Sequence, residues 1–383
     1  MAEIESKHAS CLRQLMQLGK PRSSPEEQRF YLLQLSQTFQ ELVKAAVGGD
    51  YSNPFFQDAQ TEKGYQQRIR SVIQNLNEDF ATEMSLRGHH REIVVSESGG
   101  ASDAPGVIKT SREDFIAHVK QLQQRTRGRE LPGTFNPMIV ADLFREQSRP
   151  WEAIVRRHVQ KVWDAACCFV KLVVTHTADA SAAKPLQIEA VEPAMARILE
   201  AMRDKTTELL KPHHNSHPIT NNHSFTEALQ EVRRKRQEES LEGIIKRFLR
   251  VEFIYKEDFQ SLNGRYNLSG LAESLAAYWG PNMADFAANE ALDCLNAYYK
   301  VAFKRFIDDV AVEVIETKLV CALDGILSPL SVYQMAPEQV ARIAGESAEA
   351  RTERDRLTKQ VEILGNGLET CKKFAALRLS AGE

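Results

Sequence analysis

The sequence lacks the marks of a membrane-spanning, secreted or metal-binding chain. No apolar run in its 383 residues approaches the roughly 20 residues that a membrane-spanning helix needs, and Met1–Gly19 is too charged for a signal peptide. The six cysteines are far apart except for the pair Cys167–Cys168, and none has the Cys-x-x-Cys spacing of a metal site. We therefore expect reduced, mostly buried thiols, a cytoplasmic location, and no metal or other cofactor.

A phosphate-binding loop is also missing. No stretch fits G-x-x-x-x-G-K-[ST], whose backbone amides and lysine hold the phosphates of a nucleotide. The segments GGDYSNPF and LSGLAESL contain glycine but lack the lysine and the spacing. No Ser–His–Asp or Cys–His arrangement can be argued either. We expect a chain that is not an enzyme and does not bind nucleotide.

Charge gives no general argument for binding to nucleic acids or membranes, because 49 basic residues are balanced by 52 acidic ones. One local basic segment, RRKRQEESLEGIIKRFLR (233–250), stands out. Its simplest interpretation is a solvated helix face with ion pairs such as Arg234–Glu238. Weak attraction to anionic lipids is the alternative, whereas nucleic-acid binding is not expected because aromatic side chains are not interleaved. The residues concerned are Arg233, Arg234, Lys235, Arg236, Lys246, Arg247 and Arg250.

What the sequence does contain is helical periodicity. Ser24 is a predicted N-cap and Pro25 a first helical residue, and residues 285–324 are apolar on nearly all sides, as expected of a helix inside a bundle. Strand alternation occurs only in REIVV, which we expect to be too short to seed a sheet. The fold class is therefore all-α. The expected helices cover 25–86 with a break at GGDYSNPFFQD, 111–126, 138–178, about 187–252 and 285–324.

Four histidines interrupt the predicted helix over 187–252. They are His213, His214, His217 and His223 in the stretch PHHNSHPITNNH. A zinc site would need ligands at regular spacing and acceptors behind them, and no cysteine or carboxylate is adjacent. We expect a kinked helix connection here, favoured by Pro218 and the two asparagines that follow it.

A heptad pattern occupies the C-terminal segment. Its apolar residues are spaced 4, 3, 4 and 3, with charged residues between them. Two to three heptads are too few to be stable alone, so we expect this seam to pack on residues 3–18, where Leu12 and Leu15 form a short stripe. Intermolecular coiled-coil pairing is the alternative. The seam residues are Leu357, Val361, Leu364, Leu368 and Cys371.

The segment RTRGRELPG (125–133) interrupts the helices with a basic turn. Two glycines permit positive φ and a proline cannot continue a helix, so a turn at one end of the bundle is predicted. It is either a solvated connector or a docking loop whose arginines contact carboxylates on another molecule. Its residues are Arg125, Arg127, Gly128, Arg129, Glu130, Leu131, Pro132 and Gly133.

The order of these features resembles the dynamin superfamily outside its GTPase domain, above all Mx-like and dynamin-related members of the fungal type. RGRELPG followed by FNPMIVADLFREQSRPWEAIV is similar to the family's middle-domain break and the helix after it. SVIQNLNEDFATEMSLRGHHREIV and HPITNNHSFTEALQEVRRKR fit the same pattern. The stretch from ALDCLNAYYKVAFKRFIDDVAVEVIETKLV through LETCKKF resembles a GTPase effector domain. The resemblance covers nearly the whole chain.

The resemblance implies an elongated antiparallel four-helix stalk bundle with an incomplete bundle signalling element. It places one signalling helix at 1–18, a hinge at 19–25 and the stalk at 26–327. Within the stalk, 26–252 would be the middle domain, 253–284 a tip segment and 285–327 the first effector-domain helix; 328–383 would hold a hinge and the second signalling helix, the effector domain spanning about 285–380. The implied hinge residues are Gly19, Pro21, Pro25, Pro329 and Pro337.

The implied function is self-assembly. In such proteins stalks dimerise crosswise and extend through end loops, here RTRGRELPG and the glycine- and serine-rich stretch 87–110, and assembly couples GTP hydrolysis to membrane remodelling. The expected partners are the chain itself and a full-length dynamin-like GTPase, at the surface of an organelle membrane. The alternatives are a stand-alone helical adaptor and a peripheral membrane-binding scaffold. A lost GTPase head would reflect excision, a truncated gene product or natural absence.

Two departures from the family pattern concern the tip. Residues 253–284 stand where classical dynamins carry a lipid-binding pleckstrin-homology insert. The same segment lacks the lysine-rich tip loop of antiviral Mx proteins. Phosphoinositide binding and recognition of viral targets are therefore not implied for this chain.

Overall fold

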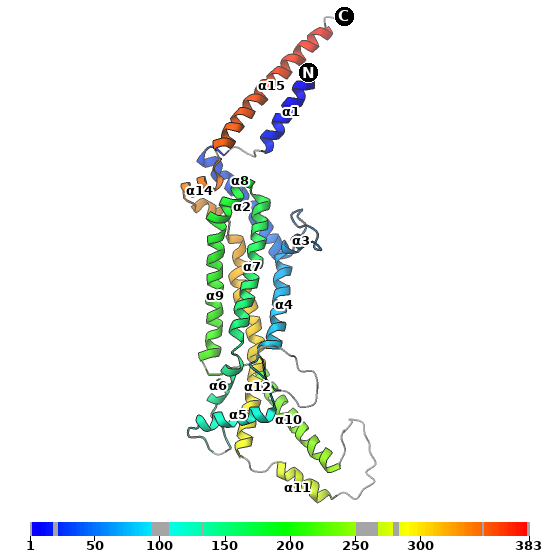
Figure 1. Cartoon of the computed structure of the whole chain (residues 1–383), viewed down its shortest axis with the longest axis vertical. Coiled ribbons are helices and arrows are strands. Elements are labelled where there is room, and N and C mark those ends of the chain that lie inside the picture. The colour runs from blue at the N-terminus through cyan, green and yellow to red at the C-terminus, as the bar shows by residue number, and fades with distance from the viewer. Residues whose placement is uncertain are drawn as a thin grey trace. The chain divides into compact units, whose positions relative to one another are not determined.

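A computed structural model describes residues 2–17, 22–93, 107–131, 133–215, 217–249, 267–278, 283–346 and 348–380. The fold is all-α, as predicted, and within these residues two three-residue strands are its only β-structure (Figure 1). The chain divides into two compact units, and the boundary between them falls within four helical segments, α4, α7, α9 and η2.

The first unit contains residues 1–75, 161–202 and 316–383. Helix α2 shows why the elements start where they do: the Ser24 hydroxyl accepts a hydrogen bond from the Glu27 amide at 3.2 Å, Pro25 occupies the first turn, and Gly49 ends the helix with φ of 78°. The elements are α1 (Ala2–Gln17), α2 (Pro25–Gly48), α3 (Glu62–Gln66), the start of α4 (Ile69–Arg87), the second part of α7 (Trp151–Thr177), α8 (Ala180–Leu186), η1 (Gln187–Val191), the start of α9 (Glu192–Asn215), the end of η2 (Val310–Leu319), η3 (Val320–Gly325), α13 (Pro329–Gln334), α14 (Pro337–Ala344) and α15 (Ala348–Ser380).

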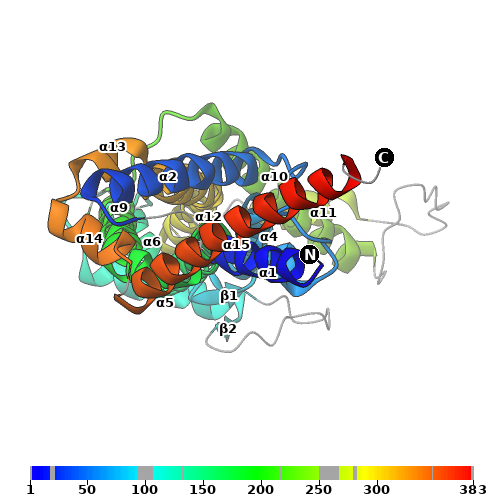
Figure 2. The same ribbon diagram turned by 90° about the horizontal axis from the view of Figure 1, so that it is seen from above.

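Helices α1 and α15 lie side by side at the two ends of the chain (Figure 2). The heptad seam faces α1: Leu357 is 1% exposed, Leu368 is buried, and Val361 and Leu364 are half-buried. Across the pair, the Cys11 thiol lies 3.7 Å from the Gln360 side-chain oxygen. The side chain of Cys371 lies outside the described residues.

The segment expected to hold a C-terminal hinge contains two short helices, α13 and α14. Pro329 and Pro337 occupy the first turns of α13 and α14, as Pro25 does in α2, whereas Gly19 and Pro21 lie outside the described residues. The Arg29 guanidinium on α2 donates to the backbone carbonyls of Val332, Tyr333 and Met335 at 2.8–3.1 Å, which satisfies the end of α13. The prolines thus start short packed helices in this part of the chain.

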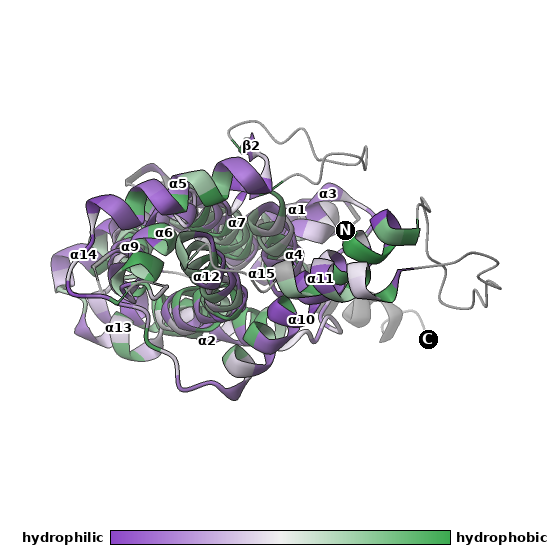
Figure 3. Cartoon of the chain, turned by 90° about the horizontal axis from the view of Figure 1, so that it is seen from below, coloured by the Kyte–Doolittle hydropathy of each residue, from purple (hydrophilic) through white to green (hydrophobic). Residues whose placement is uncertain are grey.

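The second unit contains residues 76–160 and 203–315. Its helices carry both polar and apolar segments, as α5 shows in Figure 3. The elements are the rest of α4, β1 (Arg91–Ile93), β2 (Ile108–Thr110), α5 (Arg112–Arg125), α6 (Met138–Gln147), the first part of α7, the end of α9, α10 (His223–Leu249), α11 (Leu268–Tyr278), α12 (Met283–Asp309) and the start of η2.

Two expectations about the elements are wrong, and one is confirmed. The helix expected over 138–178 is two helices, α6 and α7, because Pro150 has no amide hydrogen to donate and the chain turns at Ser148–Pro150. The first three residues of REIVV do form a strand, since Arg91–Ile93 pairs in parallel with Ile108–Thr110. The connection expected around Pro218 is present, because residues 217–222 are non-helical between α9 and α10.

A side chain completes the small sheet. The amide of Arg91 donates to the Gln147 side-chain oxygen at 3.0 Å, and the Gln147 nitrogen donates to the Arg91 carbonyl at 2.6 Å. Two short strands alone are marginal in water. Gln147 occupies the second edge of β1 as another strand would, which explains why a three-residue strand persists.

Aromatic side chains fill the core of the second unit around Trp151. Its ring is fully buried and stacks on Phe306 with the centroids 4.7 Å apart. Its indole nitrogen donates to the Tyr299 hydroxyl at 3.2 Å, and that hydroxyl donates to the Gly88 carbonyl at 2.9 Å. His213 lies against the same cluster, 5.3 Å from Trp151 between ring centroids. Burial among these rings, with the charges of His214 and Arg305 nearby, lowers the pKa of His213 to about 4.

We predict that His213 makes the fold acid-sensitive. Because its folded pKa lies below the ordinary 6.5, its stabilising effect is complete above pH 6.5 and is lost as the pH falls toward 4. The shift corresponds to a loss of on the order of 3 kcal/mol. Denaturant unfolding at pH 7.5 and pH 5 should show a smaller difference for His213→Phe than for the wild-type chain. Equal differences would contradict the assignment.

Candidate functional site

The loop between α5 and α6 is the most distinctive surface feature of the second unit. Helix α5 starts at the N-cap Ser111, whose hydroxyl accepts from the Asp114 amide at 3.0 Å, and ends where the Thr126 amide donates to the Leu122 carbonyl. Gly133 has φ of 84°, a conformation that favours glycine. The Thr134 amide then donates to the Leu131 carbonyl at 3.1 Å. The predicted turn at RTRGRELPG is present, with Pro132 outside the described residues.

The three arginines of this loop have no partner within the part of the chain that the structure describes. Arg125, Arg127 and Arg129 are exposed, and no ion pair or hydrogen bond joins them to a described residue. The one carboxylate of the loop, Glu130, accepts from the Gly128 amide at 2.6 Å. Leu131, at the loop's apex, is 74% exposed. The loop therefore presents unneutralised positive charge beside an apolar side chain.

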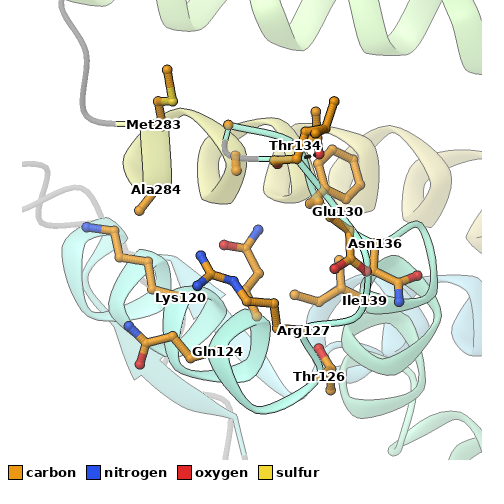
Figure 4. Close-up of a pocket in the computed structure, with 15 residues that line it drawn as sticks. Lys120, Gln124, Thr126, Arg127, Glu130, Thr134, Asn136, Ile139, Met283 and Ala284 are labelled. Carbon is orange, nitrogen blue, oxygen red and sulfur yellow. Dashed lines mark hydrogen bonds between the residues drawn. The ribbon is translucent and has the colours of Figure 1, made fainter.

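A cavity of about 450 Å³ lies beneath the loop, between α5 and the first turn of α12; we call it the α5–α12 cavity. Lys120 and Gln124 of α5 lie on one side of it, Met283 and Ala284 of α12 on another, and Arg127 points into the space between them (Figure 4). The other lining residues are Gln123, Thr126, Glu130, Leu131, Gly133, Thr134, Phe135, Asn136, Ile139 and Ala287.

Polar groups at the cavity differ in whether they are already satisfied. The Lys120 ammonium is paired with the Asp285 carboxylate. The side-chain nitrogen of Gln123 is buried and has no acceptor in the described chain. Ile139 and Ala287 are buried and give the cavity an apolar floor. The site can thus offer amide and guanidinium donors above an apolar surface.

The basic segment of α10 carries the ion pairs expected of a solvated helix face, among them Arg234–Glu238, and differs from the alternative of a lipid-facing surface. The guanidinium groups of Arg233 and Arg236 both pair with Glu290 of α12, and that of Arg236 also lies 3.2 Å from Asp293. The prediction is wrong for Arg236, whose side chain is only 18% exposed. Pairs within α10 join Arg234 to Glu238, Lys235 to Glu231 and Lys246 to Glu242; Arg247 is exposed, and Arg250 lies outside the described residues.

These pairs hold α10 to α12. In α10 the only buried residue among those described is Ala228, so little apolar surface attaches the helix. Asp293 is fully buried, and its burial raises the pKa of the carboxyl although Arg236 and Arg112 oppose the shift. A buried carboxylate of this kind is tolerated because cations surround it.

We predict that Glu290→Gln loosens α10. The substitution leaves Arg233 with a neutral acceptor and Arg236 with Asp293 as its remaining carboxylate, at a site where Glu290 is 14% exposed, and we expect it to cost about 1–3 kcal/mol. Amide hydrogen exchange in α10 should accelerate while exchange in α7 does not change.

The matched control is Glu238→Gln on α10, where an exposed pair with Arg234 contributes about 0.3–0.5 kcal/mol. Similar exchange in the two variants would show that α10 is held by other contacts.

The described residues hold neither a metal-binding cluster nor a membrane-spanning helix. The described residues contain no group of three or more His, Cys, Asp or Glu side chains that could hold a metal ion. No helix in the described part of the chain is both long and apolar enough to cross a bilayer. Of the four histidines near the α9–α10 connection, His213 is taken up by the aromatic core.

The sequence predicts the loop but not the residues of α5 and α12 that surround it. The turn residues and arginines could be recognised from composition alone. Gln123 and the first turn of α12 were not singled out, because their role depends on α12 packing against α5, and nothing in the local sequence signals that contact. The local sequence indicates only that Met283 and Ala284 begin a helix, and gives no sign of their contact with α5.

The N-terminal part of the chain matches a known family model. Residues 1–234 match the family model of the dynamin central region, a span that begins at α1 and ends within α10. The match includes the α5–α6 loop and both sides of its turn. No curated protein matches the sequence.

Proposed function

Because the family model covers residues 1–234 of 383, this chain belongs to the dynamin central region family, and we propose that it is a self-assembling stalk module. In this proposal copies of the chain dimerise and then extend into higher oligomers through the α5–α6 loop. In a complete dynamin-like protein, such assembly would couple GTP hydrolysis to membrane remodelling. The chain itself supplies scaffold surfaces and has no nucleotide site.

The observation that carries the proposal is the unneutralised charge of the α5–α6 loop. Several other arginines of the same unit pair with carboxylates: Arg233 and Arg236 share Glu290, and Arg157 pairs with Glu83. Arg125, Arg127 and Arg129 have no such partner among the described residues. Guanidinium groups suit bidentate contacts with carboxylates across an interface. A second copy, rich in exposed acidic side chains, can supply those carboxylates.

A co-assembling partner follows from the same idea. A chain that carries assembly surfaces but no catalytic head would enter the oligomers of a full-length dynamin-like GTPase. Such mixing would separate the heads that assembly normally brings together. The proposal therefore includes inhibition of a full-length partner's assembly-stimulated GTPase activity.

A stand-alone adaptor is the second candidate, and one observation favours it. Three large apolar side chains of the first unit are exposed on α2 and α13, which pack together: Phe30 at 57%, Leu330 at 66% and Tyr333 at 73%. Exposed apolar groups gathered on neighbouring elements often mark a protein-binding surface. An adaptor of this kind would be monomeric at all concentrations.

We predict that the combined change Arg125→Glu, Arg127→Glu and Arg129→Glu weakens self-association at least about tenfold, because reversed charges repel the acidic surface they should meet. Light scattering after size-exclusion chromatography, over a wide concentration range, measures the change. Wild-type association should also weaken with added salt, which screens exposed charges.

The matched control reverses three exposed basic residues away from the loop: Lys44→Glu, Lys171→Glu and Arg247→Glu. It changes the net charge equally and should leave association near the wild-type value. A wild-type chain that is monomeric throughout, or equal weakening in both triple variants, would refute assembly through the loop.

A further inference from the structure

The α5–α12 cavity contains hydrogen-bond donors that the chain does not use. The Gln123 side-chain nitrogen is buried without an acceptor in the described residues, and a buried donor left unpaired destabilises a fold. Arg127 points into the same space and has no described partner (Figure 4). Lys120 is excluded from this set because Asp285 already neutralises it. The unused groups therefore call for an oxygen acceptor, best a charged one.

The rest of the cavity suits an aliphatic stem. Ile139 and Ala287 form a buried apolar floor, and Met283, a flexible side chain that adapts to its contacts, borders it. Gly133 helps to keep the cavity open: a Cβ atom at this position would touch Met283 at 3.6 Å, and its φ of 84° disfavours any larger residue. An occupant with two or three methylene groups below an oxygen-bearing head fits both halves.

The rim of the cavity indicates that the occupant comes from a protein surface. Two large apolar side chains there are exposed: Leu131 at 74% and Met283 at 53%. A small ligand enclosed in the cavity would leave them in water. A second protein surface would cover them while one of its side chains enters the cavity, which is the arrangement of anchor and surrounding contacts found in binding hot spots.

We propose that the α5–α12 cavity receives a glutamate side chain from a second copy of this chain. The carboxylate would accept from the Gln123 amide and the Arg127 guanidinium, and its methylene groups would lie on Ile139 and Ala287. The inference rests on the proposed function, because it names the contact that the α5–α6 loop makes. It assigns specificity to the cavity, whereas the outer arginines supply attraction at longer range.

Two substitutions test the cavity without touching the arginines. Ala284 is exposed and lines the cavity, so Ala284→Trp fills it without disturbing the core. Gln123→Leu keeps a similar volume and removes the donor. We expect each to weaken self-association at least about tenfold, as loss of an interface anchor does, without lowering the temperature of thermal unfolding. Ala153→Trp, at an exposed alanine of α7 in the same unit, is the control and should associate like the wild type.

The outcomes separate this inference from the proposed function. If the triple arginine variant dissociates while Ala284→Trp and Gln123→Leu associate normally, the loop is an assembly surface and the cavity proposal is wrong. If the arginine variant also associates normally, the proposed assembly through the loop is refuted, and the cavity proposal that rests on it is refuted as well. A third arm titrates free glutarate into the wild type and into Ala284→Trp by calorimetry. Binding to the wild type alone, without any effect on association, would assign the cavity to a small dicarboxylate and overturn the glutamate proposal.

Discussion

Helix α12 must be covered on several sides, and much of the second unit follows from that constraint. Its buried residues include Leu295 and Ala297, which are two positions apart and so point to nearly opposite sides of the helix; no single neighbour could cover both, and α5, α6 and α10 all pack against α12. The same helix buries Asp293. A carboxylate inside the protein needs cations close by, and these come from α5 and α10. Apolar burial thus brings the helices together around α12, while the cations on α5 and α10 allow these two helices to pack beside the buried Asp293.

Regular elements could be predicted from the sequence because their signals are local. Ser24 and Pro25 start α2 where capping chemistry requires it, and the heptad residues of α15 face α1. The failures have physical causes. Apolar residues at helical spacing continue on both sides of Pro150, so the pattern predicts one long helix. The chain turns there instead, because proline cannot continue the helix. The strand Arg91–Ile93 depends on Gln147 for its second edge, a contact that alternation within five residues cannot reveal.

The partners of charged residues are harder to predict from the sequence than the burial of apolar ones. The arginines of α10 and those of the α5–α6 loop look alike in sequence, where the first set predicts a solvated face or weak lipid attraction and the second a connector or a docking loop. Only the positions of Glu290 and Asp293 on another helix distinguish them, because those carboxylates neutralise Arg233 and Arg236 within the chain. The cavity beneath the loop was equally hidden from the sequence, since its walls come from distant segments that meet through packing.

The two sets of arginines perform opposite tasks by the same chemistry. On α10 a guanidinium group and a carboxylate meet inside one chain, so the pair fixes the position of a helix that buries little apolar surface. On the loop the guanidinium groups remain exposed, and a carboxylate that meets them must come from elsewhere. A surface pair is weak by itself, so three arginines alone would give attraction without a defined geometry. The shape of the neighbouring cavity would supply this geometry, because an occupant must match both the donors and the apolar floor of the cavity. An assembly built on this site would therefore weaken as salt is added, while the cavity would fix the register between the two copies.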